Sequence, residues 1–229
     1  LGMTNGRTYP DLAIKESLAP LFGYNLCNNG ETAWKSYLDL ENVSKSKLNS
    51  INISDIAPSL NSIYHIDFNL VDPFARGIVR KIDCENDIFA NRIGFSKDDW
   101  VYNRFLKIQF KISYELIALE FSAACDYAND KCRLHKFLLG IICSKDDAAL
   151  ILNPSIKIPG NVYSPEFVFR YNDCENCIFV DLNSVISEED NEMFKMLGKP
   201  LFKFKHEIMN VITTAHANHE SRLGYSKFK

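Results

Sequence analysis

The sequence predicts an α+β protein whose body is mainly β, with helices at both ends of the chain. Polar and apolar residues alternate over 63–70 and again over 108–116, which is the period of a strand with one buried face. Over 116–121 both faces turn apolar, which indicates that this strand enters a core. A helix would also accommodate that run, but a strand is favoured.

The N-terminal part of the chain has a different character. Residues 10–40 carry apolar side chains at mixed helical spacings, and Pro20 and Gly23 interrupt them, so two short helices are expected. The following segment is rich in Ser, Asn and Lys and indicates a linker with at most a short helix at Ile53–Leu60. We therefore expect an N-terminal helical segment and linker over 1–62. A β-rich domain with a C-terminal helix is expected over 63–229.

The later elements are read from the same periods. Further strands are expected at Phe137–Cys143 and Ala148–Leu152. Phe167–Arg170 and Ile178–Leu182 flank a polar segment, which predicts a hairpin. A helix is expected after Pro200, with an apolar stripe that packs on the core. The stripe consists of Phe204, Ile208, Val211, Ile212 and Ala215.

Composition bounds the class of protein. The chain has 229 residues, of which 46% are hydrophobic and 24% charged, which is ordinary for a globular protein. The net charge of −3 disfavours nucleic-acid binding driven by overall charge. No apolar run reaches the ~18 residues of a membrane helix, and the first residues lack the features of an export signal. Leu1-Gly2 before Met3 resembles a tag remnant. We expect a cytoplasmic protein with seven reduced cysteines.

The strongest candidate for chemistry is the pair Cys125-Asp126, where an apolar run ends and a polar turn begins. In the functional interpretation Cys125 is a nucleophile or metal ligand with His135 as its partner. In the structural interpretation Asp126 caps the turn, Cys125 fills apolar space and Lys131 pairs with Asp126. Capping aspartates far outnumber catalytic ones, which favours the structural interpretation. The candidate catalytic residues are Cys125, Asp126, Lys131 and His135.

The sequence contains two patterns that are found in metal sites. Cys174-x-x-Cys177 has half of a zinc-site spacing, and Cys132-x-x-His135 would supply the other half. Cys132 and His135 flank the start of a strand rather than a knuckle, however. We therefore predict no metal and no cofactor.

The second pattern is that of a restriction-type nuclease, which uses an acidic residue followed by Glu-x-Lys on a strand. Gln109-x-Lys111 follows Asp98 and Asp99 here, but glutamine in place of glutamate weakens metal binding. The histidines are less informative. His65 is expected on the solvated face of its strand, and the three on the terminal helix are expected mostly off its apolar stripe.

Two motifs carry a resemblance to a known family. The first is Ala124-Cys125-Asp126-Tyr127-Ala128 followed by Lys131, and the second is Gly198–Phe202 followed by Ser221-Arg222-Leu223-Gly224. Over residues 100–229 the chain resembles an uncharacterised bacterial family found in phage-defence and other mobile loci. Relatives tend to have Arg-Pro-Gly where this chain has Arg222-Leu223-Gly224.

The resemblance implies a distorted β-barrel closed by the C-terminal helix. It also implies a partner protein from the same locus, such as a signalling or receiver-like module. The binding residues would be Asp126, Lys131 and Arg222. We therefore expect a non-catalytic binding or regulatory module of a bacterial defence or stress-response locus. The alternative is a metal-dependent nucleic-acid hydrolase that uses the Asp/Gln-x-Lys or the Cys-Asp set.

Overall fold

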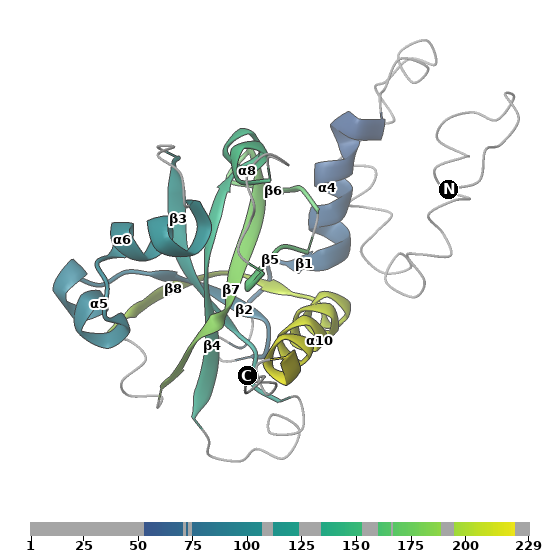
Figure 1. Cartoon of the computed structure of the whole chain (residues 1–229). Coiled ribbons are helices and arrows are strands. Elements are labelled where there is room, and N and C mark those ends of the chain that lie inside the picture. The colour runs from purple at the N-terminus through teal and green to yellow at the C-terminus, as the bar shows by residue number, and fades with distance from the viewer. Residues whose placement is uncertain are drawn as a thin grey trace, which may run out of the picture. The chain divides into compact units, whose positions relative to one another are not determined.

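The structure is a computed structural model of the whole chain (Figure 1). The chain divides into two units, Leu1–Tyr64 and His65–Lys229. Residues 53–64 of helix α4 (Ile53–His65) make up the described part of the first unit, and the helices expected over 10–40 lie outside the described residues. The described residues are 53–70, 72, 75–106, 112–123, 134–152, 160–165, 167–188 and 195–222.

The second unit is built on one antiparallel sheet, which has eight strands within the described residues. The strand order is β1-β8-β2-β3-β4-β7-β5, and β6 pairs with β7 beside this path. The strands are β1 (Ile66–Asp67), β2 (Ile78–Ile82), β3 (Tyr114–Glu120), β4 (His135–Ser144), β5 (Val162–Tyr163), β6 (Phe169–Tyr171), β7 (Cys174–Glu188) and β8 (Leu197–Phe204).

Helices lie against both faces of this sheet (Figure 1). Helices α5 and α6 contribute to the core on one face, and α10 contributes to the core on the other. None of the helices among the described residues is long and apolar enough to cross a membrane. The helices of this unit are α5 (Asn86–Ile93), α6 (Lys97–Val101), the π-helix η2 (Tyr102–Leu106), α8 (Lys145–Ile151) and α10 (His206–Arg222).

The two cores explain the continuous apolar runs of the central strands. On β3, Leu116 and Ala118 belong to the core under α5 and α6, whereas Ile117 and Leu119 belong to the core under α10. A strand buried on both faces needs apolar residues at every position, so the alternation disappears. The predicted strand at 116–121 is confirmed as far as Glu120 in β3, and the one at 137–143 lies within β4.

The sheet is not closed into a barrel, so the expected barrel-like architecture is wrong. A small barrel buries one face of its strands and exposes the other. Here both faces are apolar and a helix covers each, which is the arrangement of a layered open sheet. Helix and strand also contribute similar shares, so the body is mixed rather than mainly β.

Three expected elements differ in detail. The strand expected over 63–70 is mostly absent, because α4 continues to His65 and β1 has only two residues. The strand expected at Ala148–Leu152 is wrong, because residues 148–151 lie in α8, which Ser144 caps by accepting a hydrogen bond from the Asp147 backbone N–H at 3.1 Å. Residues 112–113 precede β3 without strand structure, so that strand begins at Tyr114.

The terminal helix packs on the core as expected, but its apolar stripe is narrower than predicted. Ile208 and Ile212 are buried in the core under α10, whereas Val211 is exposed. Phe204 precedes the helix as the last residue of β8, and Pro200 also lies in that strand. The stripe therefore combines a strand residue with helix residues, because both pack on the same face of the sheet.

The predicted hairpin is confirmed as β6 and β7. Tyr171 pairs with Cys174, which leaves Asn172 and Asp173 as a two-residue loop. Both have positive φ, at 50° and 59°, as a type I′ turn requires. Asn and Asp tolerate this left-handed backbone better than most residues.

The long strand β7 is irregular in its middle. Opposite β4, Leu138 faces Val185, whereas Gly140 faces Val180. Four residues of β7, 181–184, therefore lie opposite the single residue Leu139. The backbones approach closely beside this irregularity, because a Cβ placed on Gly140 would lie 2.3 Å from the carbonyl oxygen of Phe179. The irregular segment supplies the polar cluster described next.

Candidate functional site

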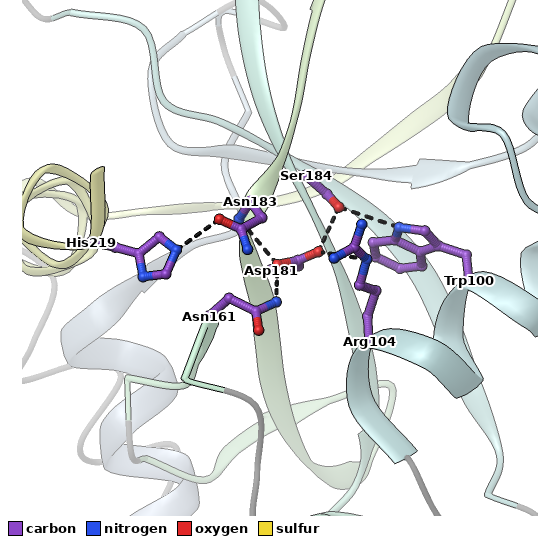
Figure 2. A network of polar contacts seen from close by, with 7 residues as sticks. All are labelled: Trp100, Arg104, Asn161, Asp181, Asn183, Ser184 and His219. Carbon is purple, nitrogen blue, oxygen red and sulfur yellow. Dashed lines mark hydrogen bonds and ion pairs between the residues drawn. The ribbon is translucent and has the colours of Figure 1, made fainter. Parts of the chain in front are cut away.

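A buried polar cluster surrounds Asp181 on the irregular part of β7 (Figure 2). The Asp181 side chain is fully buried, and four groups contact its carboxylate. The Asn161 amide donates to Oδ1 at 2.5 Å, and the Asn183 backbone N–H donates to the same oxygen at 3.0 Å. The Ser184 hydroxyl donates to Oδ2 at 2.5 Å, and Arg104 Nε lies 3.4 Å from that oxygen. Both oxygens are thus engaged.

The cluster also connects the helices on the two faces of the sheet. Trp100 of α6 donates its indole N–H to the Ser184 hydroxyl at 3.3 Å. On the other side, the His219 ring of α10 lies 2.7 Å from the Asn183 side-chain oxygen (Figure 2). Hydrogen bonds to a carboxylate, like its ion pair with an arginine, are stronger than those between neutral groups, so these contacts hold the segments together firmly. The Asp181 cluster is therefore a joint between α6, β7 and α10.

A second buried carboxylate differs in its surroundings. Glu120, the last residue of β3, is 1% exposed, and none of the described residues donates a hydrogen bond to either of its oxygens. The neighbouring group is His135 at the start of β4, whose Nδ1 lies 3.5 Å from Oε1 of Glu120. His135 is itself buried. A carboxylate beside an imidazole is the arrangement that orients a general base or a metal ligand.

Neither Glu120 nor Asp181 was singled out from the sequence. Each interrupts an otherwise apolar run, at 116–121 and at 178–182. A charged residue within such a run is the signal that would have identified both, because a buried charge requires a partner.

Three of the four candidate catalytic residues lie in the segment 124–133, and the fourth, His135, follows it. Cys125, Asp126 and Lys131 lie outside the described residues. Arg222 ends α10, and its side chain also lies outside the described part. Their assigned roles therefore stay predictions. His135 is the one catalytic candidate whose surroundings the described structure contains.

The geometry of the sheet excludes a zinc site made of Cys132, His135, Cys174 and Cys177. His135 and Cys143 lie eight residues apart on β4, and Cys143 faces Cys177 across the β4–β7 pair. At about 3.3 Å per residue, His135 and Cys177 are separated by about 26 Å along the strands. One zinc ion needs all its ligands within about 2.3 Å, so these two residues cannot share it.

Asp98 and Asp99, the acidic residues of the nuclease-like pattern, each interact with a side chain of the fold. Asp98 accepts a hydrogen bond from the Tyr114 hydroxyl, and burial together with this bond raises the pKa of Tyr114. Asp99 interacts with Ser96, which caps α6 by accepting from the Asp99 backbone N–H at 3.2 Å. Gln109 and Lys111 lie outside the described residues.

Two histidines are more buried than expected. His65 was predicted to be solvated, but its ring lies 4.7 Å from that of Phe167, and burial lowers its pKa from 6.5 to about 4. His216 of α10 is buried against Phe121, with ring centroids 4.9 Å apart. Burial lowers the pKa of His216, and Glu220 opposes that shift. Both rings are therefore neutral parts of the packing near pH 7.

Three aromatic side chains near β1 and β6, Phe68, Tyr171 and Phe202, form what we call the aromatic patch, and Phe68 is its largely exposed member. The rings of Phe68 and Tyr171 are parallel with centroids 6.5 Å apart, and Phe202 meets them edge-on at 6.1 and 5.6 Å. Phe68 is 50% exposed, whereas Phe202 is fully buried. The ion pair of Lys81 and Glu115, 3.3 Å apart, lies close enough to shift the pKa of Tyr171, which burial raises.

Comparison with known proteins found no match: no family model, no curated protein and no solved structure is similar to the chain.

Proposed function

We propose that this chain is a non-catalytic binding or regulatory module that recognises a partner protein through the aromatic patch. The observation that carries the proposal is the half-exposed ring of Phe68, stacked on Tyr171 above the buried ring of Phe202. Aromatic anchors within a charged rim are typical of the residues that dominate protein interfaces. The rim here is the ion pair of Lys81 and Glu115.

The partner in this proposal is a cytoplasmic protein encoded in the same bacterial defence or stress-response locus. The resemblance of residues 100–229 supports it, through the segment of Asp126 and Lys131 and the segment of Arg222. A signalling or receiver-like module is the partner class that this resemblance implies. These three residues would supply a polar contribution to recognition, and the aromatic patch would supply the apolar one.

Co-purification with the products of the adjacent genes tests the proposal. Phe68→Ala should weaken binding to the partner at least tenfold, because interface anchors contribute upward of about 2 kcal/mol. Phe95→Ala is the matched control, since Phe95 is also a largely exposed phenylalanine, 42% against 50%, in another part of the unit. Equal binding by wild type and Phe68→Ala would contradict the proposal.

The hydrolase alternative is favoured by one observation, the buried pair of Glu120 and His135. In that role His135 would act as general base and Glu120 would orient its ring. Hydrolysis of single- and double-stranded DNA and RNA, assayed with Mg²⁺ or Mn²⁺, tests this function. Activity that disappears in His135→Ala but survives in Phe68→Ala would replace the binding proposal.

A further inference from the structure

Two buried thiols face each other across the two longest strands of the sheet. Cys143 of β4 is paired in register with Cys177 of β7. Both side chains belong to the core under α5 and α6, so they point to the same face. Cys143 is 3% exposed and Cys177 is 6% exposed, and neither is in a disulfide.

Strand geometry brings this pair within reach of a bond. Residues opposite each other on antiparallel strands have Cα atoms about 4.5–5.5 Å apart. Disulfides form between cysteines whose Cα atoms are about 4.4–6.8 Å apart. We propose that Cys143 and Cys177 are a redox pair that peroxide converts into a cross-strand disulfide joining β4 to β7.

The reaction balances with one molecule of hydrogen peroxide. The thiolate of one cysteine attacks a peroxide oxygen, which gives a sulfenic acid and, after protonation, water. The second thiol then attacks the sulfenic sulfur, the S–S bond forms and the hydroxyl leaves as a second water. Two thiols are oxidised by two electrons in all, and the peroxide is reduced to two waters.

The surroundings of the two thiols indicate which reacts first. Burial raises the pKa of both; at Cys177 Lys145 opposes that shift more strongly than Glu175 adds to it, whereas both neighbours of Cys143 add to it. Cys177 is also the more exposed of the two. Cys177 is therefore the thiol that peroxide oxidises, and Cys143 resolves the sulfenic acid. Because the thiolate is the reactive form, oxidation is faster at pH 9 than at pH 7.

The nearby Cys174 does not compete for the same bond. It is exposed, and it lies three positions before Cys177 on β7, so its side chain points to the opposite face of the sheet. Its own register partner is Tyr171. Cys174 offers a matched control, since it is close in sequence but wrongly oriented.

Peptide mapping of the folded full chain tests the proposal. The Cys174→Ser variant is treated with hydrogen peroxide and its free thiols are alkylated. It is then digested with trypsin, which cuts after Lys and Arg, without reduction. The expected product is one peptide pair, 137–145 joined to 171–195, lighter than the sum of its parts by two hydrogens. Cys143→Ala in the same background should leave Cys177 as a sulfenic acid, trapped by dimedone.

Two results would overturn the proposal. One is that Cys143 and Cys177 both remain alkylatable when exposed thiols such as Cys174 of the wild type are already oxidised. The other is that Cys177 pairs with a different cysteine. Oxidation in urea provides the unfolded control, where pairing should be spread over several cysteines. The joined form should also show a higher urea midpoint than the reduced form, and reductant should reverse that shift.

Discussion

Asp181 and Glu120 are both buried carboxylates of one sheet, but they differ in the number of hydrogen bonds that their oxygens accept. Asp181 receives three hydrogen bonds and lies beside Arg104. Glu120 receives no hydrogen bond from the described residues, and its neighbour is the imidazole of His135, 3.5 Å away. Removing a carboxylate from water is costly unless donors replace the lost hydration. We therefore expect Asp181 to stabilise the fold through its contacts and Glu120 to contribute little to stability.

The largest effect should come from Asp181→Ala. The change leaves the donors of Asn161 and Ser184 without their acceptor, and each buried polar group left unsatisfied costs about 1–3 kcal/mol. Urea denaturation should show this loss in the free energy of unfolding. A loss below about 1 kcal/mol, the value of an ordinary hydrogen bond, would show that the cluster is not the joint described above.

A matched pair of amide variants tests the comparison directly. Asp181→Asn places an amide NH₂ among groups that all donate, so it should cost more than Glu120→Gln, where no described donor is displaced. We expect Glu120→Gln to change the free energy of unfolding by no more than about 1 kcal/mol, as for a net neutral hydrogen-bond change. The same urea titrations measure both. Equal losses would mean that Glu120 is as important to the fold as Asp181.

A third prediction uses mild acid, which tests a partly buried base instead of a buried acid. The folded state holds the pKa of His65 at about 4, below its ordinary 6.5, so the unfolded state binds more protons between these values. Stability from this group is complete above pH 6.5 and decreases as the pH falls toward 4. His65→Phe should therefore show a shallower dependence of unfolding free energy on pH from 7 to 5. An unchanged slope would contradict the assigned pKa.

The central strands and the hairpin could be predicted because their signals are local. The apolar run of β3 and β4 and the Asn172-Asp173 turn each specify their structure without distant partners. The helix α8 was missed because its start depends on one cap, Ser144 with Asp147, which an apolar pattern does not record. The open sheet was missed because burial of both faces is a property of packing, and the strand periods alone do not give it.

The candidate site was harder to predict for a different reason. His135 was identified, but its partner Glu120 lies on another strand and meets it only through the register of β3 and β4. The donors to Asp181 likewise come from segments as distant as Arg104 and Asn161. The spacing of residues along the sequence does not indicate which distant side chains come into contact in the fold. The interrupted apolar runs indicate that a partner exists, without indicating which residue it is.

The position of β8 has a consequence for synthesis on the ribosome. This last strand of the sheet lies between the first two, β1 and β2. β2 ends at Ile82, and Leu197 of β8 is made 115 positions later. At about 5–20 residues per second, that interval is on the order of ten seconds. Until β8 is made, β1 has no strand to pair with and one edge of β2 is unpaired. The nascent chain therefore exposes an unpaired strand edge until β8 is made, and such an edge is a template for aggregation.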